Sequence, residues 1–298
     1  MIFRKYNEKN AEKVVELLNI CFLKQNISEK SFSWKHFDDY FDNKSVGYVA
    51  EDNESLCSFV CFTPIGISFR EDVRKFYSCS VQATHPKYRR QGIVTRLTKM
   101  AEEEIDKEVE YIGFSNGEGV KIDKYSKNIN YEIIGRMATR YVLSALRKTS
   151  IKIKRISKVN FQDNFQPYFS IHKNSHYINW RYEKNPKYEY EYFAIQKDAQ
   201  NIGYIICKKN VIKYEVQELL FANFDLENYR QTIKAFSRFA LLNGKLFTSY
   251  TYLKNNFWLN VFPAISFTKK IGIYLTVRSK NIDLRNPERW MIQAGDIQ

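Results

Sequence analysis

The sequence predicts an α/β (α+β) protein built from two tandem units, each with a mixed, mostly antiparallel central sheet flanked by helices. Three observations support this prediction. The chain has 298 residues, which suggests two domains of about 150 residues each. Apolar residues alternate between helical spacing and short extended runs along the chain. Segments of the second half also repeat the pattern of the first half in the same order.

The first half is predicted to follow the order β-α-α-β-β-β-α-β-α-β. The strongest helix signal is at 8–22, where Ala11, Val14, Leu18 and Cys21 share one face. A second helical stripe carries Val94, Leu97, Ala101 and Ile105. The predicted elements are a strand at 2–6, helices at 8–22 and 30–40, strands at 46–51, 56–69 and 73–83, a helix at 91–106, a strand at 111–115, a helix at 118–127 and a strand at 131–144.

The second half repeats part of this order. Trp34-Lys35 precedes the strand at 47–52, and Trp180-Arg181 precedes the strand at 191–196 by a similar distance. The later predicted elements are the segment 216–221, a helix at 225–242 with Asp225 as its N-cap, a strand at 246–251, a helical segment at 253–260 and a strand at 271–277. This pattern favours a tandem duplication with a boundary near 147–160. A chance likeness of two α/β halves is the alternative.

Composition narrows the class of protein. Hydrophobic residues make up 44% of the chain and charged residues 27%, which is typical of a globular protein. The aromatic share of 16% predicts a ring-rich core or cleft. The net charge of +14 is scattered along the chain, so it indicates a solubilising surface that also suits a polyanionic small molecule. We therefore expect no nucleic acid or membrane as a partner, and the oligomeric state is not predicted.

Cysteine usage and the first residues bear on location. The five cysteines include no CxxC pair, which argues against a disulfide framework and a thiol zinc site and favours a reducing compartment. The first ten residues lack the apolar stretch of a signal peptide. No apolar run approaches the roughly 20 residues that span a membrane. The expectation is a cytoplasmic protein.

The informative motif is SVQATHPKYRRQGIVTRLTKM at 80–100. A strand through Val81 to Ala83 leads through a turn into a predicted helix that starts near Gly92. A helix start presents unpaired N–H groups and a partial positive charge, and glycine lets a ligand approach the backbone closely. Arginines lie at the start of this helix and glutamates late in it, which is against the helix dipole. A phosphate bound at the helix start would offset this unfavourable placement of charges. The alternative is a basic helix start that binds no ligand.

These residues resemble the GNAT superfamily of N-acetyltransferases. Its pyrophosphate motif Q/R-x-x-G-x-G/A is similar to the segment 89–94, which departs from it at Val94. The string ATHPKYRRQGI resembles enhanced-intracellular-survival-type acetyltransferases, which carry tandem GNAT domains. A second family pattern is similar to the segment 124–135, in which Tyr125, Lys127, Tyr131 and Gly135 match and Asn130 replaces a glycine. Each motif alone is weak, but both occur in the expected order of elements.

The resemblance implies an acetyl-CoA-dependent N-acetyltransferase, with a catalytic domain at 1–147 and a degenerate GNAT-like domain at 148–298 that shapes the substrate cleft. At the position that corresponds to the phosphate motif, the second half carries Asp225 and Glu227, which would repel a pyrophosphate. Tyr125 would protonate the leaving thiolate, or else it is a packed aromatic. The implied cofactor-binding residues are Val81, Gln82, Ala83, Arg89, Arg90, Gln91, Gly92, Ile93, Val94 and Asn116, the last with a turn role as its alternative.

Other chemistry is less well defined by the sequence. No general base is identified, and Glu51, Glu118 and His85 are candidates by residue type only. Cys79 suggests a covalent acyl-enzyme, but a buried cysteine usually packs. His172 and His176 lie four residues apart without further ligands, so no metal is expected.

The acceptor is predicted only by class. The paired Trp-Lys and Trp-Arg segments and the segment 286–296 resemble two-unit GNAT proteins associated with surface polysaccharide biosynthesis. This favours an amino-sugar or a nucleotide-linked amino-sugar, with Trp34, Tyr177 and Trp180 either stacking on a sugar ring or packing in the core. The alternatives are a non-catalytic acyl-CoA-binding regulatory protein, a tandem-GNAT aminoacyl or peptidyl transferase and, from charge alone, a nucleic-acid-binding protein.

Overall fold

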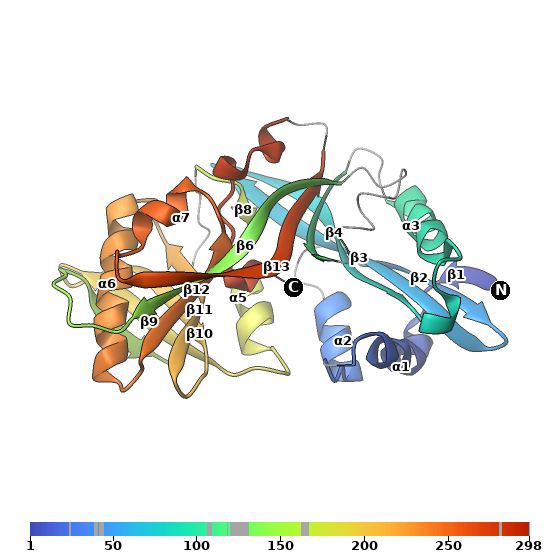
Figure 1. Cartoon of the computed structure of the whole chain (residues 1–298), viewed down its shortest axis with the longest axis horizontal. Coiled ribbons are helices and arrows are strands. Elements are labelled where there is room, and N and C mark those ends of the chain that lie inside the picture. Colours follow the sequence, from blue (N-terminus) through green and yellow to red (C-terminus); the bar gives the residue numbers. More distant parts are fainter. Residues whose placement is uncertain are drawn as a thin grey trace.

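The structure is a computed structural model that describes residues 1–23, 25–38, 41, 45–105, 109–117, 119, 131–161, 167–279 and 282–297. One mixed sheet runs through the whole molecule, with helices packed on it in both halves (Figure 1). Most neighbouring strands are antiparallel, and the parallel pairs are β4 with β5 and β11 with β12. The predicted fold class is confirmed.

The first half follows the predicted order. The predicted helix at 118–127 falls almost entirely outside the described residues. The elements are β1 (Ile2–Lys5), α1 (Ala11–Cys21), α2 (Glu29–His36), β2 (Val46–Asp52), β3 (Ser55–Phe69), β4 (Asp72–Thr84), α3 (Ile93–Glu104), β5 (Glu110–Asn116) and β6 (Glu132–Leu143), with 3-10 turns at Glu8–Asn10 and Pro86–Tyr88.

The second half contains the predicted elements and some that the sequence pattern did not indicate, among them β7 and β10. Asp225 caps α6 as predicted, because its Oδ1 accepts a hydrogen bond from the Glu227 N–H at 2.8 Å. The elements are β7 (Lys152–Ile156), β8 (Ser170–Ile171), α5 (Ser175–Ile178), a π-helical turn (Asn179–Glu183), β9 (Tyr190–Lys197), β10 (Gln200–Lys208), β11 (Lys213–Phe221), α6 (Leu226–Leu242), β12 (Phe247–Leu253), α7 (Asn256–Val261) and β13 (Ser266–Arg278), followed by 3-10 turns at Ile282–Arg285, Pro287–Arg289 and Ala294–Asp296.

The strand order is symmetric about the middle of the sheet. It is β1-β2-β3-β4-β5-β13-β6-β12-β11-β10-β9-β7, and β8 pairs with β3. From either end of this order, the sheet has two outer strands and then an antiparallel hairpin. The next strand is parallel to the second strand of the hairpin, and the strand after that is the last strand of the other half. Thus β13 lies beside β5 and β6 lies beside β12, so the two halves exchange their last strands.

The two halves also share a β-bulge at the same place. On β4, Cys79 pairs with Phe62 and Val81 pairs with Cys61, which leaves Ser80 as the extra residue. On β11, the same shift leaves Gln217 extra. The parallel pairing to the next strand includes Ser78 in the first half and Glu215 in the second, each two residues before the bulge. This agreement in register supports a duplication over a chance likeness.

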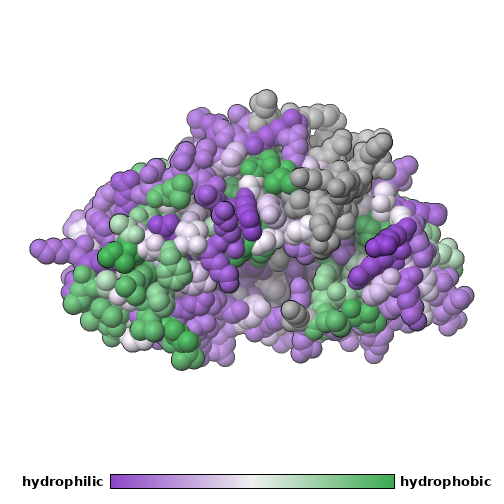
Figure 2. Space-filling view, in the orientation of Figure 1, coloured by the Kyte–Doolittle hydropathy of each residue, from purple (hydrophilic) through white to green (hydrophobic). Residues whose placement is uncertain are grey.

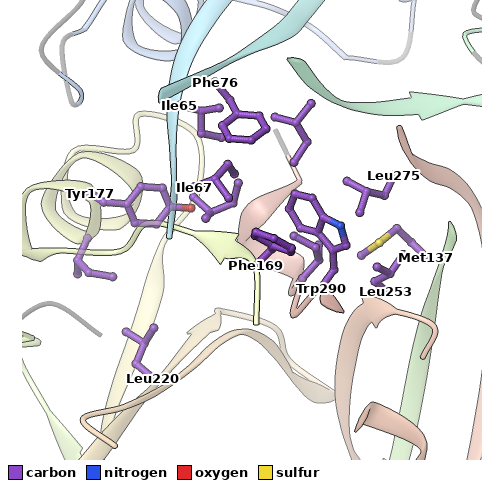
Figure 3. Packing of buried hydrophobic residues seen from close by; sticks show 14 of the residues in the cluster. Ile65, Ile67, Phe76, Met137, Phe169, Tyr177, Leu220, Leu253, Leu275 and Trp290 are labelled. Atoms are coloured by element: carbon purple, nitrogen blue, oxygen red, sulfur yellow. The ribbon is translucent and has the colours of Figure 1, made fainter. Parts of the chain in front are cut away.

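The halves share part of their hydrophobic core. One cluster of buried side chains draws Ile65, Phe76 and Met137 from the first half and Phe169, Leu220, Leu253 and Trp290 from the second (Figure 3). Two further clusters cover opposite faces of β2, β3 and β4, one with α3 and one with α1 and α2. The helices α3 and α2 therefore lie on opposite sides of the strands that carry the predicted site.

Exposed apolar surface gathers at the end of the molecule where α6 lies (Figure 2). The exposed large apolar side chains include Val211, Ile212, Leu242 and Leu246. This surface belongs to the second half and lies far from α3 in Figure 1, so it is not part of the predicted cofactor site. Within the described ranges, no helix is both long enough and apolar enough to cross a membrane.

Candidate functional site

The strands β4 and β5 separate in the middle of the first unit. Their parallel pairing runs only from Phe76 with Glu110 to Ser78 with Ile112, although β4 continues to Thr84 and β5 to Asn116. We call the space between the ends of β4 and β5 beyond these pairs the wedge. Among the described residues, β4 pairs along the wedge only with β3. On the edge of β4 that faces away from β3, the backbone N–H and C=O groups need hydrogen-bond partners. The amide groups of a ligand would supply such partners.

The predicted pantetheine-binding residues lie on β4 along the wedge. Val81, Gln82 and Ala83 pair with Cys61, Val60 and Phe59 of β3. Their side chains are already engaged in the fold: Val81 and Ala83 pack in the cluster with α1 and α2, and the Gln82 amide donates to Thr98 Oγ1 of α3 at 3.3 Å. These residues therefore offer a ligand their backbone groups rather than their side chains.

The predicted phosphate turn is open. Gly92 and Arg90 both adopt left-handed φ angles of 72° and 65°, and Gly92 precedes α3 without a side-chain cap. Apart from Gly92 itself and its two chain neighbours, no atom of the described residues lies within 4 Å of where a Cβ on Gly92 would stand. Arg89, Arg90 and Gln91 are exposed, Ile93 is buried and Val94 is half-buried. Uncapped N–H groups at a helix start are suited to bind a phosphate.

The order of charges along α3 has a partial structural explanation. The late acids are all paired: Glu102 with Arg278 at 2.7 Å, Glu103 with Lys99 at 3.9 Å, and Glu104 with Lys5. Near the start, Arg89 Nε donates to the Thr84 carbonyl at 3.2 Å, and the Arg96 guanidinium lies 3.9 Å from the centroid of the Phe3 ring. The late acids therefore have partners within the protein, and the open turn is the feature of this helix start that suits a phosphate.

The remaining predicted residues lie beyond β5. Asn116 ends β5, and its Oδ1 accepts a hydrogen bond from the Gly119 N–H at 2.8 Å, which is the turn role named as its alternative. Tyr125, the predicted proton donor, and Glu118 lie outside the described residues. Tyr131 follows that segment, and its hydroxyl is buried with no hydrogen-bond partner in the described part of the chain. Burial raises the pKa of Tyr131 well above its usual value.

The candidate bases and nucleophile named by residue type have structural roles. His85 caps the turn Pro86–Tyr88, where its Nδ1 accepts from the Lys87 N–H at 3.3 Å. Glu51 pairs with Arg4 at 2.9 Å. Cys79 is half-buried against the cluster with α3. Within the described ranges, no three His, Cys, Asp or Glu side chains are grouped to hold a metal ion.

A polar network beside the bulge was not predicted from the sequence. His36, at the end of α2, is only 4% exposed, and its Nδ1 lies 3.0 Å from the Oγ of the bulged Ser80. Ser80 also accepts a hydrogen bond from Thr63 at 2.9 Å, and Thr63 accepts one from Ser45 at 3.2 Å. Burial and then the charge of Lys35 lower the pKa of His36 well below its ordinary value. His36 is therefore a neutral imidazole at the start of the wedge.

In the second unit, the corresponding space is filled by the chain itself. Pairing of β11 with β12 ends at Val216 and Tyr250, although both strands continue. Beyond that point the Gln293 amide exchanges two hydrogen bonds with the backbone of Leu219, at 2.8 and 3.3 Å. Asp296 accepts from the Gln293 N–H at 2.7 Å and pairs with the buried Lys173 at 2.8 Å. Polypeptide thus occupies the place in the second unit that corresponds to the wedge of the first.

The aromatic residues named as sugar-stacking candidates are core residues. Trp34, Tyr177 and Trp180 are 8%, 2% and 3% exposed, and the two tryptophan rings stack on each other. The stacking hypothesis is wrong for these three side chains because the two halves cover them.

Comparisons with known proteins agree with this architecture. A family model described as an acetyltransferase (GNAT) domain matches residues 3–127. No curated protein matches the chain. A probable N-acyltransferase from Enterococcus faecalis has a similar structure, with 14% identity, a TM-score of 0.67, and 93% of this chain and 71% of that chain covered.

Two further solved structures are similar. A GCN5-related N-acetyltransferase from Anabaena variabilis has 11% identity and a TM-score of 0.68 over 94% of this chain and 73% of its own. A tandem GNAT protein from the clavulanic acid biosynthesis pathway has 8% identity and a TM-score of 0.60 over 93% and 98%. These likenesses concern the fold and extend over both halves. The family model thus matches the first half of the chain to a GNAT acetyltransferase domain, and the fold of the whole chain is similar to that of GNAT proteins.

Proposed function

We propose that the protein transfers an acetyl group from acetyl-CoA to a primary amine at the wedge between β4 and β5. The observation that carries this proposal is the separation of β4 from β5 at the Ser80 bulge, next to the open turn at Gly92. The separated strand and the open turn offer backbone donors to pantetheine and to a pyrophosphate, respectively. The proposed acceptor class is an amino-sugar or a nucleotide-linked amino-sugar.

The chain's own groups account for cofactor binding. Backbone groups of Val81, Gln82 and Ala83 would hold the pantetheine amides. The N–H groups of the segment 89–94 would hold the pyrophosphate, and Asn116 would contact the cofactor from the β5 side. Acetyl-CoA supplies an acetyl group activated as a thioester. A backbone N–H on β4 is our candidate for the oxyanion donor, because such a donor is fixed before the reaction.

The positions of the helices separate the two substrates. Since α3 covers one face of β2, β3 and β4 and α2 covers the other, a pyrophosphate at Gly92 would occupy the α3 side. The acceptor would then approach from the α2 side, where His36 lies beside Ser80. Holding both reactants in one place replaces a bimolecular encounter with an oriented one.

The transfer forms one bond and breaks another. The amine nitrogen attacks the thioester carbonyl carbon, the C–N bond forms and the C–S bond breaks. One proton must leave the nitrogen and one must reach the sulfur. We assign the first to His36: Ser80 donates to the Cys61 carbonyl at 3.2 Å and accepts from Thr63, so His36 Nδ1–H donates to Ser80 and Nε2 can accept a proton. We assign the second to Tyr125.

The second unit has a supporting role in this proposal. The domain at 148–298 is a degenerate GNAT-like unit that binds no CoA and shapes the acceptor cleft. Two observations support this role. The Gln293 side chain accepts a hydrogen bond from the Leu219 N–H, and Asp225 is the N-cap of α6, where a phosphate would have to bind. An acid at that position repels a pyrophosphate.

The experiment that tests the proposal is thiol release from acetyl-CoA across a panel of amino-sugars, nucleotide-linked amino-sugars, polyamines, aminoglycosides and peptides. We expect acceptor-dependent release with at least one amine. Stabilisation by CoA without release on any amine would instead support the second candidate, a non-catalytic acyl-CoA-binding protein, which keeps the open turn but needs no proton donor.

A further inference from the structure

Four loops meet at one end of the sheet, and we call them the end loops. They are residues 144–149 after β6, 209–212 between β10 and β11, 243–246 between α6 and β12, and 262–265 before β13. The strand register brings them together. Leu143 at the end of β6 pairs with Phe247 at the start of β12, which pairs with Lys213 at the start of β11. Ser266, the first residue of β13, pairs with Val142.

Hydrogen bonds connect three of the end loops directly. The Leu246 N–H donates to the Ile212 carbonyl at 3.0 Å, and the Ser144 N–H donates to the Leu246 carbonyl at 3.0 Å. The Lys245 Nζ donates to the Val211 carbonyl at 2.8 Å. These loops therefore form one continuous surface rather than separate tips.

Large aliphatic side chains project from these loops and from the end of α6. Val211 is 88% exposed and Leu146 is 72% exposed, although loop turns usually carry small or polar residues. Single exposed apolar residues are common, but a group of them marks an interaction surface. Exposed apolar surface gathers near α6 in Figure 2. The most exposed members are Leu146, Val211, Ile212, Leu242, Leu246 and Ile265.

The charge around these side chains is one-sided. The end loops contain no Asp or Glu, and the long stretch 228–282, which includes α6, β12 and β13, also contains none. Cations lie beside the apolar residues in sequence: Arg147 and Lys148 follow Leu146, and Lys245 precedes Leu246. The Arg147 Nη2 donates to the carbonyl of Leu143, at the end of β6, at 3.5 Å.

Few acids offset this charge. Among the described residues, the acids that contact the end loops are Glu189, which pairs with Lys209 at 2.7 Å, and Glu215, which pairs with Lys213 at 3.0 Å. Each of them neutralises one lysine, and Lys148 is exposed. The end loops thus combine an aliphatic centre with an excess of positive charge.

An anionic lipid surface matches this combination better than other partners do. A second copy of the chain would place the same cations against each other, which opposes association. Single-stranded nucleic acid binds by stacking its bases on aromatic rings, whereas the most exposed side chains here are aliphatic. A protein partner takes apolar anchors into well-packed contacts, whereas Val211 and Leu146 stand almost free in solvent.

We propose that the end loops dock on the surface of a bilayer that contains anionic lipids. The aliphatic side chains would enter the boundary between headgroups and acyl chains, and the cations would lie among the lipid phosphates. The expectation of no membrane partner rested on charge that is scattered along the sequence, but the fold gathers cations and apolar residues at one end. This end lies far from α3 in Figure 1, so the inference does not depend on the proposed acetyl transfer.

The first test is co-sedimentation with vesicles of two compositions. One set is pure phosphatidylcholine, and the other is an equimolar mixture of phosphatidylcholine and phosphatidylglycerol. We expect binding to the mixed vesicles to be at least about tenfold tighter, because each cation near an anionic surface contributes about fivefold. High salt should weaken this binding. No binding to the mixed vesicles, or equal binding to both sets, would overturn the proposal.

The second test removes an apolar side chain. Val211→Asp should weaken binding to the mixed vesicles by about tenfold or more, since it loses an apolar contact and adds a charge that the surface repels. Leu23→Asp is the matched control, because Leu23 is 87% exposed and lies after α1 in the first half. Both changes are at exposed positions, so both melting temperatures should match the wild type. Equal losses of binding in the two variants would contradict the assignment to the end loops.

The third test reverses one charge. Lys148→Glu should weaken binding to the mixed vesicles by about fivefold or more. Lys30→Glu is its control, because Lys30 is exposed on α2 in the other half of the chain, and it should bind like the wild type. Equal affinities of Lys148→Glu and Lys30→Glu would show that the charge of the end loops does not contribute, which would overturn the proposal.

A last measurement distinguishes a bilayer from a second copy of the chain. Sedimentation velocity without lipid should show no association through the end loops. A dimer that Val211→Asp dissociates, together with no vesicle binding by the wild type, would assign the end loops to contact between copies and overturn the proposal. Vesicle binding by a protein that acetylates no amine would leave this inference standing while the proposed function fails, and the reverse result would separate them in the opposite way.

Discussion

Trp34 and Trp180 exchange hydrogen bonds across the two halves of the chain. The Trp34 indole N–H donates to the Trp180 carbonyl at 2.9 Å, and the Trp180 indole N–H donates to the Trp34 carbonyl at 3.0 Å. The rings stack with an interplanar angle of 22°. The two tryptophans that the repeat aligns are thus each other's hydrogen-bond partners. This contact inside the protein gives both tryptophans a structural role.

Trp34→Phe should destabilise the protein by about 1–3 kcal/mol beyond the loss of ring volume, because the buried Trp180 carbonyl loses its donor. The matched control is Trp258→Phe. Trp258 is 1% exposed, and its indole N–H has no hydrogen-bond partner in the described part of the chain, so this change costs volume only. Urea unfolding of both variants measures the difference. Equal losses would mean that the exchanged hydrogen bonds contribute nothing.

The free energy of unfolding should change with pH because Lys35 has a lowered pKa in the folded protein. Its pKa is about 8 in the folded protein against 10.5 in the unfolded chain, so between these values the unfolded chain binds more protons. Stability should therefore rise with pH across this window. The difference in unfolding free energy between the wild type and Lys35→Met, measured from pH 7 to 11, isolates this group because other titrations largely cancel. A difference that stays flat or falls with pH contradicts the assignment.

His36→Gln should slow acetyl transfer by about 10²–10⁴-fold, the usual effect of losing a general base, with little change in CoA affinity. The pKa of His36 lies well below its ordinary value, so its imidazole stays neutral near pH 6.5. Protonation of His36 should therefore not lower the wild-type rate near that pH. His176→Gln is the control, since His176 is exposed. Unchanged turnover in His36→Gln would leave His36 as a packing residue.

Tyr125→Phe should slow turnover by about 10²–10⁴-fold while CoA affinity stays the same, because the hydroxyl is needed only when the C–S bond breaks. Tyr131→Phe is the matched control: its hydroxyl has no partner among the described residues, so both rate and affinity should persist. Single-turnover rates and CoA titrations of the two variants decide this. A loss confined to Tyr131→Phe would move the proton donor to that residue.

The periodic parts of the fold could be predicted from the sequence. The faces of α1, α3 and α6 follow helical spacing, and the Asp225 cap could be recognised from its position alone. The sequence also indicated the helix start near Gly92, but the left-handed φ of this glycine and the open space around it come from the structure.

Features that depend on distant contacts could not be predicted. The exchange of β6 and β13 and the insertion of Gln293 beside Leu219 join segments far apart in the chain. The Ser80 bulge is a shift of one residue in pairing, which leaves no mark in the composition of β4. The role that we propose for His36 depends on its contact with that bulge. Trp34 and Trp180 have aromatic character suited to a sugar, but their burial depends on each other.

The central claim is a single CoA site at the turn before α3. Titration calorimetry of CoA into the wild type should give one site per chain, and Gly92→Glu should abolish binding by placing a charged side chain where the pyrophosphate belongs. Gly244→Glu is the matched control, because Gly244 has a similar φ of 71° and similarly open surroundings in the second unit, so it carries the same backbone strain and should bind CoA like the wild type. Two sites per chain, or equal binding by both variants, would contradict the account.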